Sequence, residues 1–144
     1  TNDAAQRLAD LENGRKHGNH NTLDLILTDL STTANYEDSI ALACSVHDRV
    51  VAGLSQFHVQ PKNRGIKQAL FYVLMQTRIP SILFEAGFTS NRNEFHRLLD
   101  PHYRHLLARE LVDGVTRWKA HVDNKEKNPT AISAIQKKTC NLSQ

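Results

Sequence analysis

The 144-residue sequence has few cysteines and no long apolar run. Its two cysteines, Cys44 and Cys140, are too few and too far apart to indicate a disulfide framework. No window approaches the roughly 18 consecutive apolar residues of a membrane-spanning helix, so we expect no membrane span. With 40% hydrophobic and 23% charged residues, the composition excludes a disordered or collagen-like chain and indicates about one folded domain.

The only methionine, Met75, is internal, and the first residues lack the pattern of a secretory signal. We therefore expect a mature product or a piece of a longer protein.

The net charge of +3 is concentrated at the C-terminal end of the chain. Residues 119–144 hold five lysines against two acidic residues, and the preceding residues are balanced. A nucleic-acid-binding domain would carry a basic stripe with interleaved aromatic residues on its folded part, so we expect no nucleic-acid partner. We expect residues 1–120 to form the folded part and residues 121–144 to form a basic, flexible tail.

Apolar spacing predicts helices over residues 2–13, 23–30, 36–56, 91–99 and 101–122. Ser90 is expected to cap the fourth helix, and Asp100 followed by Pro101 to start the last. The runs 71–74 and 81–84 are short, rich in strand-forming residues and bounded by breakers such as Pro80. This pattern favours an α/β fold, a mixed twisted sheet flanked by helices, of which this chain supplies only a few strands.

The same spacing predicts the buried faces of the two longest helices. The stripe of the 36–56 helix consists of Ile40, Cys44, His47, Val51 and Leu54. The stripe of the 101–122 helix consists of Tyr103, Leu107, Leu111, Val115 and Trp118.

Glu85 is the outstanding candidate for chemistry, because it directly follows the second predicted strand. Alternation along that strand places Glu85 on the face opposite Ile82 and Phe84. Open α/β sheets have their sites at the carboxyl ends of strands, and partial burial there would suit a carboxylate to proton transfer. The alternative is a structural glutamate that pairs with Arg64 or Lys67.

Two histidine pairs could indicate a metal site. His17 and His20 lie in a predicted loop, and His102 and His105 lie on a predicted helix. Zinc takes three or four protein ligands, and neither pair has a clear third ligand nearby, so solvent-exposed histidines are the better interpretation. The sequence also lacks a glycine-rich phosphate loop, a Gly-x-Ser-x-Gly elbow and a His-Glu-x-x-His helix.

Two segments carry a family resemblance. Residues 63–74 read Asn-Arg-Gly-Ile-Lys-Gln-Ala-Leu-Phe-Tyr-Val-Leu, and residues 79–91 read Ile-Pro-Ser-Ile-Leu-Phe-Glu-Ala-Gly-Phe-Thr-Ser-Asn. They resemble the C-terminal half of the zinc-dependent N-acetylmuramoyl-L-alanine amidases of the amidase-3 family. The flanking segments agree in order and spacing over about residues 1–120.

The resemblance implies cleavage of the amide between N-acetylmuramic acid and the L-alanine of the stem peptide. In the family, two histidines and a glutamate hold zinc (Zn), and a second glutamate, in a Glu-x-Gly-Phe motif, is the general base and acid. Glu85 matches this second glutamate, whereas all three metal ligands correspond to positions upstream of Thr1. We therefore expect no metal ligand in this chain and no activity from these residues alone.

The residues expected to shape the substrate groove are Arg64, Gly87, Phe88 and Asn91. The resemblance further implies peptidoglycan as the partner, a periplasmic or extracellular location in the cell envelope, and a monomer. The alternative is a catalytically dead remnant or a peptidoglycan-binding protein that lacks the metal ligands.

Overall fold

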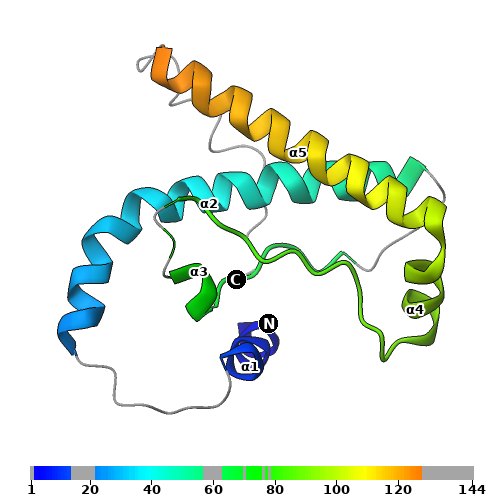
Figure 1. Cartoon of the computed structure of the whole chain (residues 1–144), viewed down its shortest axis with the longest axis horizontal. Coiled ribbons are helices and arrows are strands. Elements are labelled where there is room, and N and C mark those ends of the chain that lie inside the picture. The colour runs from blue at the N-terminus through cyan, green and yellow to red at the C-terminus, as the bar shows by residue number, and fades with distance from the viewer. Residues whose placement is uncertain are drawn as a thin grey trace.

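The structure, a computed structural model, describes residues 2–13, 22–56, 63–69, 71–75, 77 and 79–127. This part of the chain forms five helices (Figure 1). They are α1 (Asn2–Glu12), α2 (Thr22–Gln56), α3 (Tyr72–Met75), α4 (Arg92–Leu99) and α5 (Pro101–Lys127). The long helix α2 is central. Helix α5 packs along one side of it, and α1 and α3 lie on the other side (Figure 1).

The predicted α/β fold with a mixed twisted sheet is wrong. Apart from a single bridge residue, Ile66, no described residue belongs to a strand. The first predicted strand contains the one-turn helix α3, in which the Leu74 amide donates to Phe71 O at 3.0 Å. The second predicted strand, residues 81–84, is neither helical nor paired with another strand. Strand propensity alone does not make a sheet, because a strand needs a neighbour for its backbone hydrogen bonds, and the described chain supplies none.

The predicted helices are present, but several of their boundaries differ from the prediction. Helix α1 is confirmed. The elements predicted at 23–30 and 36–56 are one continuous helix, α2, of 35 residues. Asp100 begins α5 as predicted, since its carboxylate accepts from the His102 amide at 2.9 Å and Pro101 is the first helical residue. Helix α4 is capped by Asn91 instead of Ser90.

Helices α2 and α5 run antiparallel and enclose the core. The buried core cluster consists of Leu42, Val46, Val50, Leu54, Leu106 and Leu107. The two backbones approach closely at Gly114, where an added Cβ would lie 2.7 Å from Val46 Cα. The Ser45 hydroxyl donates to Gly114 O at 2.8 Å, which ties the helices together at the same point.

A charged network lies beside this apolar contact. Glu110 of α5 is only 3% exposed, and its carboxylate accepts from Arg49 Nη2 of α2 at 2.6 Å and from Arg109 Nη2 at 2.8 Å. Arg49 Nε also pairs with Asp113. A buried carboxylate is tolerated when it is paired and hydrogen-bonded, and this pairing links the two helices.

The predicted buried faces are confirmed in part. Leu54 on α2 and Leu107 on α5 are buried, and Tyr103, Leu111 and Trp118 pack against the core cluster as predicted, but other positions differ. On α2, residues 40, 44, 47 and 51 of the predicted stripe are only half-buried, and the buried apolar positions besides Leu54 are 42, 46 and 50. On α5, Val115 is exposed, and Glu110 and Gly114 face the partner helix instead. A charged residue and a glycine carry no apolar signal, so their spacing was not recognised.

Cys44 is disulfide-bonded and is not a free thiol.

None of the described helices has a stretch both long and apolar enough to cross a bilayer. Helix α5 continues to Lys127, five residues beyond its predicted end. The rest of the predicted flexible tail, residues 128–144, lies outside the described residues, as does the predicted loop 14–21.

Candidate active site

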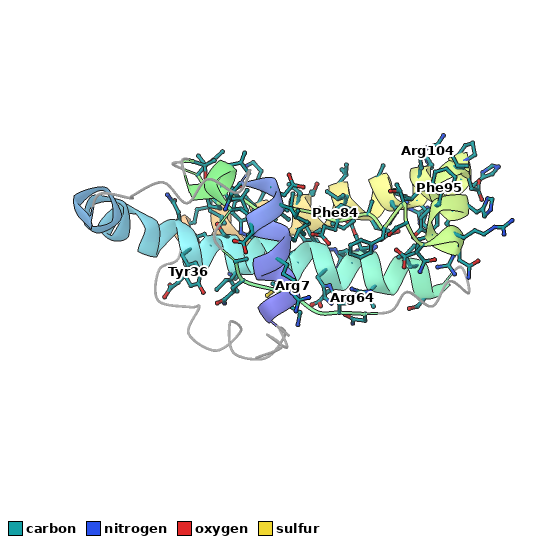
Figure 2. The ribbon with its side chains drawn as sticks, turned by 90° about the horizontal axis from the view of Figure 1, so that it is seen from below. Arg7, Tyr36, Arg64, Phe84, Phe95 and Arg104 are labelled. Carbon is teal, nitrogen blue, oxygen red and sulfur yellow. The ribbon has the colours of Figure 1, made fainter. Side chains whose placement is uncertain are left out.

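The segment 79–88 lies between α3 and α4 and is neither helix nor paired strand, and it carries the candidate general base (Figure 1). Ile82 and Phe84 pack against the core cluster, and Figure 2 shows Phe84 in the middle of the molecule. Leu83 is 44% exposed. The predicted alternation is thus confirmed over residues 82–85, although it comes from packing on the helices and not from a sheet. It ends at Ala86, which was predicted to share the face of Ile82 and Phe84 but is exposed.

Few hydrogen bonds hold this segment to the helices. At its start, the Ser81 amide donates to the Ser39 hydroxyl of α2 at 2.9 Å. The Ser81 hydroxyl donates to Ile79 O at 2.9 Å and lies 2.8 Å from the Thr77 hydroxyl. The segment is therefore anchored at its beginning by serine and threonine side chains and along its middle by apolar contacts.

Glu85 lies at the end of this segment with an exposed side chain. The expected partial burial is not found, because no sheet covers the carboxyl. The alternative ion pair is not found either: Glu85 makes no salt bridge with Arg64 or Lys67, all three of which lie in the described part of the chain. Its carboxylate is open to solvent and to a reacting partner.

A tight turn connects Glu85 to α4. Gly87 has φ 153°, a conformation that favours glycine. The Phe88 amide donates to Glu94 Oε2 at 2.8 Å, and the Asn91 amide donates to Phe88 O at 3.0 Å. The Asn91 side chain then accepts from the amides of Asn93 at 3.1 Å and Glu94 at 3.3 Å. Two of the four predicted groove residues, Gly87 and Asn91, thereby shape the backbone of the turn.

The other two predicted groove residues, Arg64 and Phe88, come together although they are distant in sequence. The Arg64 guanidinium lies 5.0 Å from the centroid of the Phe88 ring. The loop that carries Arg64 turns at Gly65, which has φ 67° and whose amide donates to Asn63 Oδ1 at 2.8 Å. A cation over an aromatic face is attracted to it, so the ring positions the guanidinium close to the turn that follows Glu85.

Helix α4 is fixed at its other end by α5. Arg104 Nη1 donates to Leu98 O and Leu99 O, each at 2.8 Å, and so satisfies the last carbonyls of α4. Figure 2 shows Arg104 and Phe95 at the end of the molecule where these helices meet. Burial raises the pKa of the nearby Tyr103 phenol above 10.0; Arg97 lowers it and Glu94 raises it.

The described residues do not fit a zinc site. Within them, no group of three or more histidine, cysteine, aspartate or glutamate side chains is placed to hold a metal ion. His102 and His105 are exposed on α5, and His17 and His20 lie outside the described residues.

The sequence comparisons identify the family. The sequence model of the N-acetylmuramoyl-L-alanine amidases matches residues 9–117, and the chain belongs to this family. The match includes Glu85, the turn that follows it and the loop of Arg64.

Curated relatives match smaller parts of the chain. It is 32% identical over 82 residues to "Uncharacterized protein YqiI" of Bacillus subtilis, and this match covers 57% of the chain and 37% of the relative. It is 32% identical over 87 residues to an uncharacterized cell wall amidase of Bacillus anthracis, with 58% of the chain and 15% of the relative covered. It is 38% identical over 53 residues to "Probable cell wall amidase LytH" of Staphylococcus aureus, with 37% of the chain and 18% of the relative covered.

The chain therefore spans less than two fifths of the length of the curated relatives it matches. No solved structure gives a significant match.

Glu94 is the residue of this site that the sequence analysis missed. Glu94 lies outside the Glu-x-Gly-Phe motif, and its only sequence signal is its place three positions after the capping Asn91. That spacing is typical of the first turn of a helix and does not by itself indicate contact with a preceding turn.

Proposed function

We propose that this chain contributes the proton-transfer group of a peptidoglycan hydrolase that cleaves the amide between N-acetylmuramic acid and the L-alanine of the stem peptide. The observation that carries the proposal is Glu85: an exposed carboxylate, free of ion pairs with Arg64 and Lys67, on a turn whose backbone is held by Asn91 and Glu94. Family membership supports the reaction, and the names of two relatives refer to cell wall amidases.

In this mechanism Glu85 acts twice. As water attacks the amide carbonyl carbon, the carboxylate accepts a proton from the water. As the C–N bond breaks, the carboxylic acid gives that proton to the nitrogen of the leaving alanine. The second proton of the water stays on the oxygen that attacked, so the immediate products are the lactyl carboxylic acid and the free amine of alanine, and Glu85 returns to its ionised form. The carboxylic acid then passes its proton to the amine or to solvent. A positioned general acid–base of this kind contributes about 10²–10⁴ in rate.

Substrate contacts are assigned to the residues around the turn. The Arg64 guanidinium, oriented by the Phe88 ring, is suited to bind a carboxylate of the stem peptide, because guanidinium and carboxylate form charge-assisted hydrogen bonds. The backbone of Gly87 lies beside Glu85, and the exposed Phe88 ring offers an apolar wall. Asn91 closes the groove while it caps α4.

The described residues do not supply the ligands for the zinc ion that the family uses. Because the described residues hold no ligand set for it, we propose that its ligands lie outside them and derive no step through the metal. Since peptidoglycan lies outside the cytoplasmic membrane, we also propose a location in the cell envelope.

The test is Glu85→Gln in the full-length gene product that contains this chain. We expect release of stem peptide from purified peptidoglycan to fall by about 100-fold or more, because glutamine cannot carry the proton. Glu37→Gln, the same change at an exposed position of α2, is the matched control and should keep full activity.

Two outcomes would contradict the proposal. Near-full activity of Glu85→Gln would remove Glu85 from the mechanism. A wild-type protein that sediments with peptidoglycan without releasing stem peptide would favour the alternative, a binding protein that has lost hydrolysis.

A further inference from the structure

The carboxylate of Glu94 holds the backbone that follows Glu85. Glu94 lies in the first turn of α4, and its Oε2 accepts from the Phe88 amide at 2.8 Å. Phe88 is only three residues beyond Glu85. A hydrogen bond from a backbone amide to an ionised carboxylate is among the stronger ones, so this contact restrains the turn.

The helix that carries Glu94 is itself fixed. Asn91 caps its N-terminus through the amides of Asn93 and Glu94, and Arg104 of α5 binds the carbonyls of Leu98 and Leu99 at its other end. Leu98 also packs against the core cluster. Glu94 is therefore attached to the α2–α5 core, and the turn it binds takes its position from that core.

Gly87 and Glu94 fit each other. A Cβ added to Gly87 would lie 3.3 Å from Glu94 Oε2 and 3.6 Å from Glu94 Cβ. The carboxylate thus fills the space beside Gly87 where another residue would have a side chain. Since no strand in the described chain pairs with residues 79–88, the Glu94 contact is the side-chain hydrogen bond that fixes the backbone between Glu85 and α4.

We propose that Glu94 is a positioning residue for the amidase reaction: it fixes the turn 85–88 so that the Glu85 carboxylate is presented in one orientation. This inference rests on the proposed role of Glu85. Glu94 does not touch the substrate; it acts through the backbone of Gly87 and Phe88.

If Glu94 only stabilised its own helix, its variants would give different results. An acidic residue in the first turn of a helix stabilises it through the helix dipole, and that effect requires the negative charge. The positioning role requires an acceptor oxygen at the same place, which glutamine retains. Glu94→Gln should therefore preserve the function of Glu94 in positioning, whereas Glu94→Ala should remove it.

The experiment measures kcat and KM for stem-peptide release by the full-length gene product. For Glu94→Ala we expect kcat to fall about tenfold, because a misplacement on the order of 1 Å costs up to about 100-fold, with KM within about twofold. Glu94→Gln should stay within about threefold of wild type. Asn93→Ala, which changes an exposed side chain on the same helical turn, is the control and should have no effect.

A double-mutant cycle connects the effect to Glu85. If Glu94 acts through Glu85, adding Glu94→Ala to Glu85→Gln should cause no further loss, because the group being positioned is already absent. An equal tenfold loss in both backgrounds would show a general structural effect and overturn the inference.

Hydrogen exchange gives a readout that does not depend on activity. The Phe88 amide should be protected in wild type and in Glu94→Gln, and should exchange faster in Glu94→Ala, while the amides of α5 stay unchanged. An unprotected Phe88 amide in wild type, or an unchanged kcat in Glu94→Ala, would overturn this inference alone. An inactive wild-type protein would overturn the proposed function, and the positioning role with it.

Discussion

The α2–α5 pair and the segment 79–88 are held together in different ways. The helices share an apolar core, a close backbone approach at Gly114 and a charged network around Glu110. The segment has two inward side chains, a hydrogen bond from Ser81 to Ser39 at one end and the contact of Phe88 with Glu94 at the other. Its remaining apolar side chains are open to solvent, with Ile79 69% and Phe88 38% exposed.

This difference gives the two regions different roles: the helix pair stabilises the fold, and the segment carries the candidate catalytic residue. Cooperative burial makes the helices a rigid support, and the side chains on their facing sides are occupied with one another. The segment contributes little burial, so its side chains stay available, and Glu85 lies there. Binding and catalytic residues are commonly found on connecting segments positioned by a rigid scaffold, which is the arrangement seen in this chain.

The largest effect is expected when the charged network of the helices is broken. Arg49→Ala leaves Glu110, whose side chain is 4% exposed, without its closest partner, and should lower the free energy of unfolding by about 3 kcal/mol. Arg117→Ala removes the exposed, one-turn pair with Asp113 and should cost about 0.5 kcal/mol or less. Urea unfolding measures both. Equal losses would show that the network does not set the stability of the helix pair.

A smaller effect should appear within the segment, between neighbouring side chains. Phe84→Ala removes a half-buried ring from the core cluster and should cost about 2 kcal/mol, less than the roughly 3–5 kcal/mol of a fully buried ring. Leu83→Ala, at the exposed neighbour, should cost about 0.5 kcal/mol. Thermal unfolding of the two variants is the measurement. An equally large loss for Leu83 would mean that both faces of the segment are covered, as in a sheet.

The smallest effect concerns pH at the junction of α4 and α5. Burial raises the pKa of Tyr103, with a lowering contribution from Arg97 and a raising one from Glu94. A raised pKa means that the folded state binds the phenolic proton more tightly. Stability is therefore unaffected below the unfolded value of 10.0 and is lost as the pH rises through the folded value. Unfolding curves of wild type and Tyr103→Phe should run in parallel up to about pH 9.5 and diverge above it, with Tyr103→Phe losing less. Parallel curves at all pH values would place Tyr103 in a solvent-like environment.

Several features of the fold follow from local signals. Asp100 and Pro101 begin α5 because capping and a fixed proline φ act within a few residues. The inward positions of Ile82 and Phe84 follow from period-two alternation, which any extended segment on a core obeys. The location of Glu85 next to Gly87 is a property of the chain itself, and family membership of residues 9–117 rests on the same local sequence.

Other features depend on partners that are remote in sequence. Whether a strand-prone run pairs is decided by its neighbours, so residues 71–74 contribute to α3 and residues 81–84 stay unpaired. The burial of Glu110 depends on Arg49, 61 residues away. Phe88 is only six residues from Glu94, but the far end of α4, the helix that carries Glu94, is held by Arg104 of α5.

The sequence alone determined where α1 and α5 begin, that Ile82 and Phe84 point inward and which carboxylate is the candidate base, because these depend on neighbours within a few positions. Only the tertiary structure decided that the segment is unpaired, that a glycine and a glutamate lie at the contact between α2 and α5, and that Glu94 binds the turn after Glu85. The physical reason is that burial, ion pairing and hydrogen bonding of these groups arise from the packing of α2, α4 and α5 against one another, which no local pattern encodes.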